Sequence, residues 1–153
     1  MLSNNRQMRK VELPDDILLS NVRILIADGH TVTIRVKGNS MRPFLENGRD
    51  SVILAPFSEL KRGDVILAEI TQGQYILHRI IRMKGDCLTL MGDGNLKGTE
   101  SCNTSDVIGV VTTLIRDGKP LDCSSRKWKI SSRIWGALRP MRRYLLAIYR
   151  RII

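Results

Sequence analysis

The sequence GNSMRPFL at residues 38–45 carries the features that decide the fold of this chain. Before it, residues 31–37 (TVTIRVK) alternate apolar with polar side chains, which predicts a half-buried β-strand leading to Ser40. Pro43 cannot continue a central strand and restricts the preceding Arg42 to extended geometry, so we expect the chain to turn out of the sheet here. That turn would leave the Ser40 hydroxyl exposed at the end of a strand.

A second segment, YILHRII at residues 75–81, has the composition of a strand and contains His78. With a period of two, Ile76, His78 and Ile80 share one face of that strand. A serine hydroxyl needs a base to become nucleophilic at neutral pH, and a neutral imidazole can accept its proton. The residues alone leave two other interpretations open, a turn serine bonded to its own backbone and a structural core histidine. The other histidine, His30, falls in a predicted surface turn.

The rest of the chain predicts many short strands separated by turns. Turn signals such as KRGD, QG, KGD and DG punctuate the sequence, and the QG pair at 72–73 predicts a hairpin. The acids after Pro14 and the glycine at position 29 bound a short amphipathic helix. This pattern predicts a mainly β fold with an antiparallel, coiled or barrel-like sheet. The further expected strands are 51–54, 64–70, 75–83, 87–91 and 107–115.

Four segments, in this order, resemble the signal peptidases. In the first, Gly38, Ser40, Met41, Pro43 and Leu45 match the family pattern G-x-S-M-x-P-x-L. The others are LKRGDVI at 60–66, ILHRII at 76–81 and LMGDGN at 90–95. Most bacterial signal peptidases place a lysine where this chain has a histidine, so the chain is similar to the Ser–His type of the endoplasmic reticulum, archaea and some bacteria. The resemblance implies the β-fold shared by signal peptidases and self-cleaving repressors.

The resemblance also assigns roles within a predicted active site. Ser40 would be the nucleophile and His78 its general base. A third group should orient the imidazole. Asp93 is the first candidate for it by motif, with Asp106 and Glu100 as alternatives further along the chain.

Three residues around the nucleophile are expected to form the oxyanion and substrate-binding site: Gly38, Met41 and Pro43. The leading donor to an oxyanion is the backbone N–H of Ser40. Many lysine-type relatives place a hydroxyl two residues before the serine, and Gly38 supplies none at that position.

The predicted function is that of a serine endopeptidase which cleaves a leader or signal-like peptide through an acyl-enzyme. Two alternatives belong to other classes. One is a catalytically degenerate relative that serves as a membrane-surface binding or scaffold module. The other is a self-cleaving repressor, which the resemblance would lead us to expect with an upstream DNA-binding helix-turn-helix and a lysine base. About thirty residues precede the first predicted strand and His78 replaces the lysine, so we disfavour the repressor.

Composition narrows the class of protein further. The chain has 153 residues, of which 42% are hydrophobic and 26% charged, as expected for one folded domain with a modest core. Its three cysteines show no C-x-x-C spacing, which argues against a disulfide framework or a zinc site and fits a reducing compartment. We therefore expect no metal and no cofactor.

The net charge of +10 is concentrated at the C-terminus. Residues 1–125 hold sixteen Lys/Arg and fifteen acids (+1), whereas residues 126–153 hold nine Lys/Arg and no acid (+9). Aromatic and aliphatic residues recur there at helical spacing, with interruptions expected at Gly136 and Pro140. This basic tail predicts a helix that attaches to an anionic membrane surface. A helix packed on its own domain and a nucleic-acid-binding tail are the alternatives.

The predicted organisation has three parts: a helical lead-in at 1–30, a catalytic β domain at 31–125 and the basic tail at 126–153. The N-terminal sixteen residues are polar, and no run reaches the roughly 18 apolar residues of a spanning helix. We therefore expect neither a signal peptide nor the N-terminal membrane anchor of authentic signal peptidases. The expected location is cytoplasmic, peripheral on the inner face of the cell membrane, with a peptide or preprotein as substrate.

Overall fold

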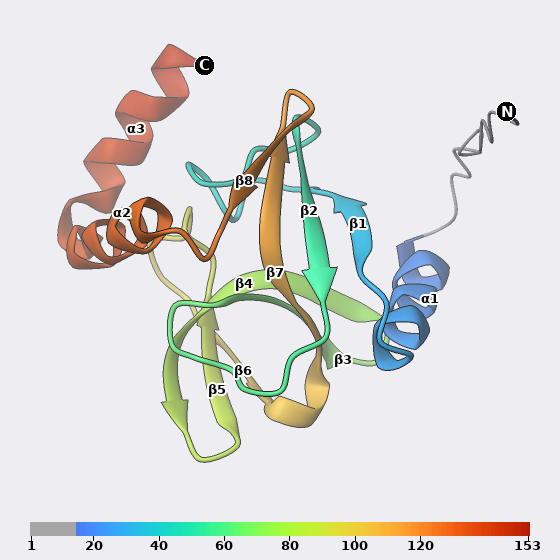
Figure 1. Ribbon diagram of the computed structural model, residues 1–153. Coiled ribbons are helices and arrows are strands. Elements are labelled where there is room, and N and C mark those ends of the chain that lie inside the picture. Colours follow the sequence, from blue (N-terminus) through green and yellow to red (C-terminus); the bar gives the residue numbers. More distant parts are fainter. Residues whose placement is uncertain (1–14) are drawn as a thin grey trace, which may run out of the picture.

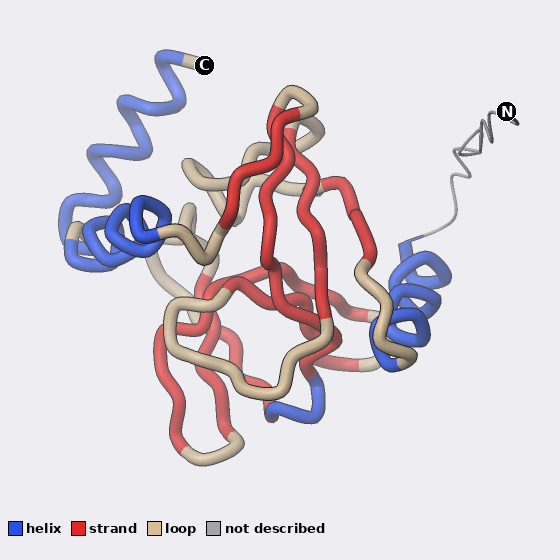
Figure 2. The backbone as a smooth tube through the Cα atoms, viewed as in Figure 1, coloured by secondary structure: helices blue, strands red, loops and turns tan. Residues whose placement is uncertain are grey.

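The computed structural model describes residues 15–153, and the part of the predicted lead-in before Asp15 lies outside that range. Strands form the centre of the molecule and the α-helices lie at its periphery (Figure 2). In chain order the elements are α1 (Asp15–Ala27), β1 (Val32–Arg35), β2 (Asp50–Ala55), β3 (Val65–Thr71), β4 (Gln74–Lys84), β5 (Cys87–Met91), β6 (Glu100–Asn103), η1 (Thr104–Asp106), β7 (Val107–Arg116), β8 (Lys119–Asp122), α2 (Arg126–Ala137), η2 (Arg139–Met141) and α3 (Arg142–Ile152).

The eight strands make one antiparallel sheet in the order β1-β2-β7-β3-β4-β5-β6, and β8 pairs with β7. The sheet does not close, so the expected mainly β, antiparallel fold is confirmed as an open, strongly bent sheet rather than a barrel. The upright β2 and β7 stand above the curved β3–β4 pair (Figure 1). Helix α1 lies at one end of the molecule and α2 with α3 at the other, and no helix in the described range is long and apolar enough to cross a membrane.

The hydrophobic core consists of two apolar clusters. Successive side chains of a strand point to opposite faces of the sheet, so one strand can contribute to both clusters. On β4, Leu77 packs with the cluster around Leu54 and Leu114. Ile76 and Ile80 of the same strand pack with the cluster around Ile66 and Leu90. The predicted sharing of one face by Ile76 and Ile80 is therefore confirmed. Each cluster buries side chains from several non-adjacent strands, which is what holds β4 in place.

The strand predictions hold within a few residues, and the hairpin at 72–73 joins β3 to β4 as expected. Two strands were missed. β6 has the sequence ESCN and β8 the sequence KPLD, so neither shows apolar alternation. The predicted tail helix breaks at η2, which contains Pro140, but Gly136 lies inside α2, so the interruption expected there is wrong.

Asp50, at the start of β2, is fully buried and ties the segment after Ser40 to β7. Its carboxylate accepts hydrogen bonds from Arg49, from Arg116 at 3.0 and 3.1 Å, and from the Glu46 backbone N–H at 2.8 Å. Burial would raise the pKa of this carboxyl, but the bonds from Arg49, Arg116 and Glu46 outweigh it and lower the pKa to about 2. Arg116 also donates to the Phe44 carbonyl at 2.9 Å, so one cluster fixes both ends of residues 44–50.

Replacing Asp50 should weaken the fold and change its response to acid. We expect Asp50→Asn to lower the free energy of unfolding at pH 7 by about 3 kcal/mol, because Arg116 loses its buried partner. The pKa is lower in the folded chain than in the unfolded one. The carboxylate therefore contributes fully above about pH 4, and roughly 2 kcal/mol is lost as the pH falls to about 2.

Urea unfolding at several pH values measures both effects, with Asp28→Asn, an exposed acid, as the matched control. A wild-type and an Asp50→Asn protein of equal stability at pH 7 would show that the cluster does not hold this segment.

Candidate active site

The loop after β1 holds Ser40 through bonds at both of its ends. Gly38 has a φ of +79°, a conformation that favours glycine, and its N–H donates to Asn47 Oδ1 at 3.1 Å. The Gly48 N–H donates to the Val36 carbonyl at 3.0 Å, which closes the loop on itself. Met41 is buried next to Ser40 and anchors the loop in the core. Ser40 therefore sits on a fixed backbone in a turn after β1, which ends at Arg35, whereas the sequence predicts a strand over residues 31–37.

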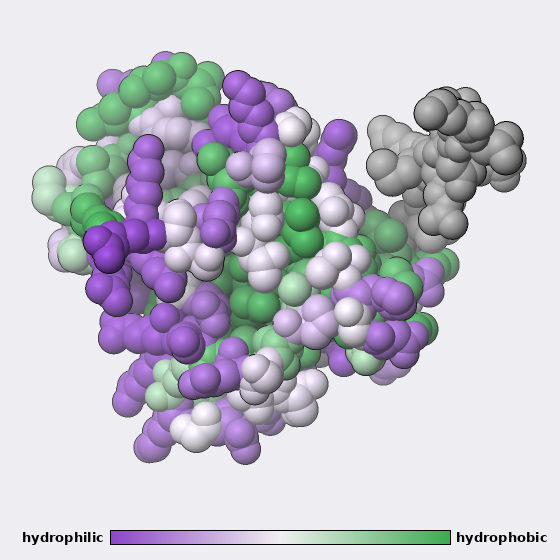
Figure 3. Space-filling view, in the orientation of Figure 1, coloured by the Kyte–Doolittle hydropathy of each residue, from purple (hydrophilic) through white to green (hydrophobic). Residues whose placement is uncertain are grey.

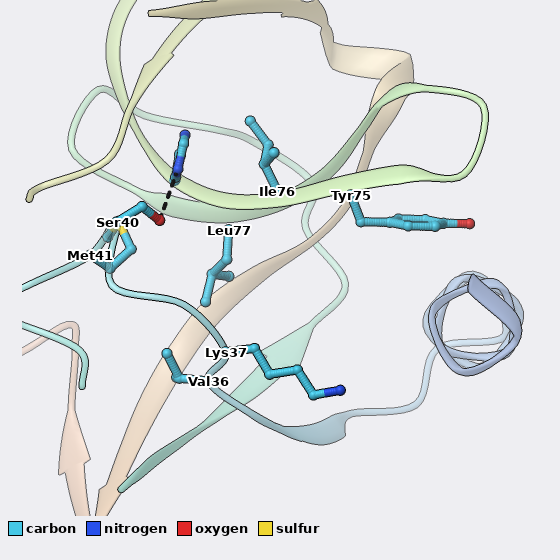
Figure 4. A pocket seen from close by; sticks show the side chains of 8 residues that line it. Val36, Lys37, Ser40, Met41, Tyr75, Ile76 and Leu77 are labelled. Atoms are coloured by element: carbon cyan, nitrogen blue, oxygen red, sulfur yellow. Dashed lines mark hydrogen bonds between the residues drawn. The ribbon is translucent and has the colours of Figure 1, made fainter. Parts of the chain in front are cut away.

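Ser40 and His78 are brought together across the bend of the sheet. His78 lies on β4, is 5% exposed, and its Nε2 is 3.1 Å from Ser40 Oγ (Figure 4). The other ring nitrogen, Nδ1, is 2.9 Å from Glu100 Oε2. With a proton on Nδ1, the imidazole donates to the Glu100 carboxylate and its Nε2 accepts from the serine hydroxyl. A hydrogen-bonded chain therefore runs from acid to imidazole to hydroxyl.

Glu100, rather than Asp93, is the acid against the imidazole. Glu100 starts β6, which pairs with β5 so that Glu100 faces Leu90, itself paired with Ile80 of β4. Two ladder pairings thus carry Glu100 across to the strand of His78. From the sequence, Glu100 is the last of the three candidates because it is displaced from the position of the family's acid and its side chain has a different length. Strand β6 also lacks the apolar alternation that would reveal its pairing with β5. Asp106, the third candidate, accepts from the Asn103 backbone N–H at 2.8 Å in the turn after β6.

Asp93 forms a buried ion pair with Arg79 instead. Arg79 Nε and Nη2 donate to the two Asp93 carboxylate oxygens at 2.8 and 2.7 Å, and both residues are less than 10% exposed. Because Arg79 follows His78 on β4, its side chain points to the opposite face of the sheet. Asp93 therefore lies on the face of the sheet opposite His78, where its ion pair with Arg79 orients the 92–95 loop rather than the imidazole.

The 92–95 loop approaches Ser40 so closely that it admits no side chain at two positions. The Gly94 N–H donates to the Ser40 carbonyl at 2.7 Å. A Cβ on Gly92 would lie 2.4 Å from that carbonyl oxygen and 3.1 Å from His78 Nε2, and one on Gly94 would lie 2.8 Å from the Asn39 carbonyl. The two glycines of LMGDGN thus let two backbones meet at Ser40.

The C-terminal helices support this loop from the other side, a role that the sequence did not indicate. Trp135 Nε1 donates to the Asp93 carbonyl at 2.8 Å. Arg142 is buried, its Nη1 donates to the Asn95 carbonyl at 3.3 Å, and burial lowers its pKa. The rings of Trp135 and Phe44 lie 6.3 Å apart in an edge-to-face arrangement. Helix α2 and the start of α3 therefore form part of the wall that positions the site.

The three residues expected at the oxyanion and substrate site lie in different places. The Gly38 N–H donates a hydrogen bond to Asn47 within the loop, so it is already paired. Met41 lines a small cavity beside Ser40, about 140 Å³ in volume. Pro43 lines a second hollow, about 290 Å³, against Trp128. The first cavity is completed by Val36, Lys37, Tyr75, Ile76, Leu77 and His78 (Figure 4).

The family comparison supports a hydrolase of the serine-peptidase type at the level of the family. A family model described as Peptidase S24-like matches residues 1–112, that is 112 of the 153 residues, and the chain belongs to this family. The match places the chain in the superfamily that joins signal peptidases and self-cleaving repressors. No curated protein matches the sequence. Within residues 15–153, no group of three His, Cys, Asp or Glu side chains is arranged to hold a metal ion.

The close approach at Gly92 can be tested with a single methyl group. We expect Gly92→Ala to lower the free energy of unfolding by about 3 kcal/mol, because the new Cβ would overlap the Ser40 carbonyl. Gly136→Ala is the matched control. Position 136 is open and helical, so the same change there should stabilise the protein by up to about 1 kcal/mol. Urea unfolding measures both, and equal effects would contradict the packing described here.

Proposed function

We propose that this protein is a serine endopeptidase in which Ser40 is the nucleophile, His78 the general base and Glu100 the positioning acid. The chain of hydrogen bonds from Glu100 through His78 to Ser40, at 2.9 and 3.1 Å, carries this proposal. Membership of the Peptidase S24-like family supports it at the level of the reaction class. The Ser–His pair, in place of a serine and a lysine, favours the likeness to the Ser–His signal peptidases.

The proposed reaction follows from the positions of the polar atoms. Ser40 Oγ attacks a substrate carbonyl while His78 Nε2 takes the hydroxyl proton. Glu100 stabilises the imidazolium that results and keeps the ring in the required orientation. The backbone N–H of Ser40 is the donor we propose for the oxyanion. The tetrahedral intermediate collapses, His78 gives the proton to the leaving amine, and water then hydrolyses the acyl-enzyme by the same proton transfers in reverse.

The substrate we propose is a leader or signal-like peptide with a small residue before the cut. The cavity beside Ser40 is narrow, about 140 Å³, and its wall includes the side chains of Val36 and Leu77. Such a space suits a short aliphatic side chain. β1, which leads to Ser40, is an edge strand of the sheet, so an extended peptide can pair with it and bring its carbonyl to the serine.

A catalytically degenerate binding module is the second candidate. In that alternative, Ser40 and His78 would have no joint catalytic role. The fully connected chain of acid, imidazole and hydroxyl argues against it, because such a chain has no purpose in a scaffold. We therefore favour the enzyme.

Removing either member of the pair should abolish cleavage. We expect Ser40→Ala and His78→Ala each to lower kcat/KM by at least about 10⁴-fold, with the double variant no worse than either single one, because the two residues act as a unit. A peptide library derived from a whole proteome, read by tandem mass spectrometry, reports cleavage without knowledge of the natural substrate. Cleavage by Ser40→Ala at the wild-type sites would sink the peptidase proposal.

Glu100 should act through the imidazole, which predicts two separate effects. We expect Glu100→Gln to lower kcat by about 10²-fold with little change in KM. Loss of the negative charge disfavours the imidazolium, so the acidic limb of the pH–rate profile should move to lower pH. Asp106→Asn, at the other acid considered beyond the motif, is the matched control and should change neither. A Glu100→Gln enzyme with an unmoved acidic limb would show that Glu100 does not orient the base.

A further inference from the structure

The C-terminal helices have two faces, and only one of them packs on the domain. The inner face contains Trp128, Ser132, Trp135, Arg142 and Leu146, which are buried or half-buried. Ser132 accepts from Arg79 at 3.1 Å and Trp135 donates to the 92–95 loop. This contact accounts for one alternative raised by the sequence, a helix that packs on its own domain. It leaves the opposite face unexplained.

We call that opposite face the outer face. It consists of six large apolar side chains that are between 48% and 77% exposed: Ile130, Ile134, Met141, Tyr144, Ile148 and Ile152. Tyr144, Ile148 and Ile152 recur every four residues, so they form one stripe along α3. Apolar side chains gather over α3 at the upper left of the space-filling view (Figure 3). Soluble proteins seldom leave such a stripe exposed unless it binds something.

Basic side chains flank the stripe and indicate that its partner is negatively charged. Eight of the nine Lys/Arg of residues 126–153 are exposed, since only Arg142 is buried, and this range contains no acid. On α3, Arg143, Arg150 and Arg151 are exposed beside the apolar stripe. The partner should therefore present negative charge next to apolar material. A nucleic acid offers the charge and could stack on Tyr144, but it offers no apolar surface for the exposed Ile148 and Ile152.

We propose that the outer face docks onto a bilayer surface rich in anionic phospholipid. α2 and α3 have 12 and 11 residues, too few to cross a bilayer, so they would lie in its interface. The apolar stripe enters the boundary between headgroups and acyl chains, and the arginines contact lipid phosphates. The cytoplasmic leaflet is rich in anionic lipids, so on this proposal the protein would lie on the inner face of the membrane.

The two faces together link the membrane to the active site. The inner face grips the 92–95 loop through Trp135 and Arg142, and that loop bonds the Ser40 backbone. Docking of the outer face would therefore hold Ser40 at a fixed position relative to the lipid. On the proposed function, this favours peptide substrates that lie at the membrane surface. Because the inner face is part of the site, deletion of the tail would confound binding with catalysis, and point variants of the outer face are needed.

The test is sedimentation of the full chain with vesicles. Vesicles of equal parts phosphatidylglycerol and phosphatidylcholine should bind the protein, pure phosphatidylcholine should not, and added salt should weaken binding. We expect the double variant Tyr144→Ser/Ile148→Ser and the triple variant Arg143→Ser/Arg150→Ser/Arg151→Ser each to reduce binding at least tenfold. Ile24→Ser, an exposed isoleucine of α1, and Arg82→Ser/Lys84→Ser, exposed bases of β4, are the matched controls and should bind like wild type.

Three results would overturn the proposal. The first is an intact protein that does not bind the anionic vesicles, and the second is an apolar variant that binds them as wild type does. The third is a gel shift of duplex DNA or RNA that the arginine variant loses and the apolar variant keeps, which would assign the outer face to nucleic acid. Repeating the vesicle assay with Ser40→Ala separates this test from the proposed peptidase activity, because docking should not depend on the nucleophile.

Discussion

The contact on which the site depends is the hydrogen bond from the Gly94 N–H to the Ser40 carbonyl, 2.7 Å long. It joins the loop that carries the serine to the loop after β5, and it forms only because neither glycine of Gly92-Asp93-Gly94 has a Cβ to keep the backbones apart. The same approach brings Gly92 next to the imidazole of His78. A motif that reads as catalytic in the sequence is thus first a packing motif.

The pleat of β4 places the imidazole of His78 and the ion pair of Arg79 on opposite faces of the sheet. His78 and Arg79 are consecutive, so their side chains leave the strand on opposite faces. The imidazole meets Ser40 and Glu100 on one face, while the guanidinium binds Asp93 on the other. A buried, bidentate Arg–carboxylate pair is rigid, and breaking it would strand a charge in the interior. The 92–95 loop is therefore held by two contacts, the ion pair of Asp93 with Arg79 and the hydrogen bond from the Gly94 N–H to the Ser40 carbonyl.

The basic tail extends this arrangement to the surface. Its inner face packs tryptophan rings against Phe44, which lies in the loop that carries Ser40, and its outer face keeps a row of exposed apolar side chains among arginines. Helix periodicity allows one segment to serve both tasks, because residues three and four apart share a face. The same two helices therefore contact the 92–95 loop on one side and carry the exposed apolar and basic surface on the other.

The sequence by itself determined the mainly antiparallel β fold, most strands, the hairpin at 72–73, and the proximity of Ser40 to His78 implied by the matching segments. These follow from local alternation, turn residues and motif order, which the chain carries in short stretches. Only the tertiary structure decided that Glu100 rather than Asp93 meets the imidazole, and that Trp135 and Arg142 hold the active-site loop. Glu100 reaches His78 through two successive strand pairings, and Trp135 reaches Asp93 across 42 residues. Contacts of that kind are set by the register and packing of distant elements, and no local pattern encodes them.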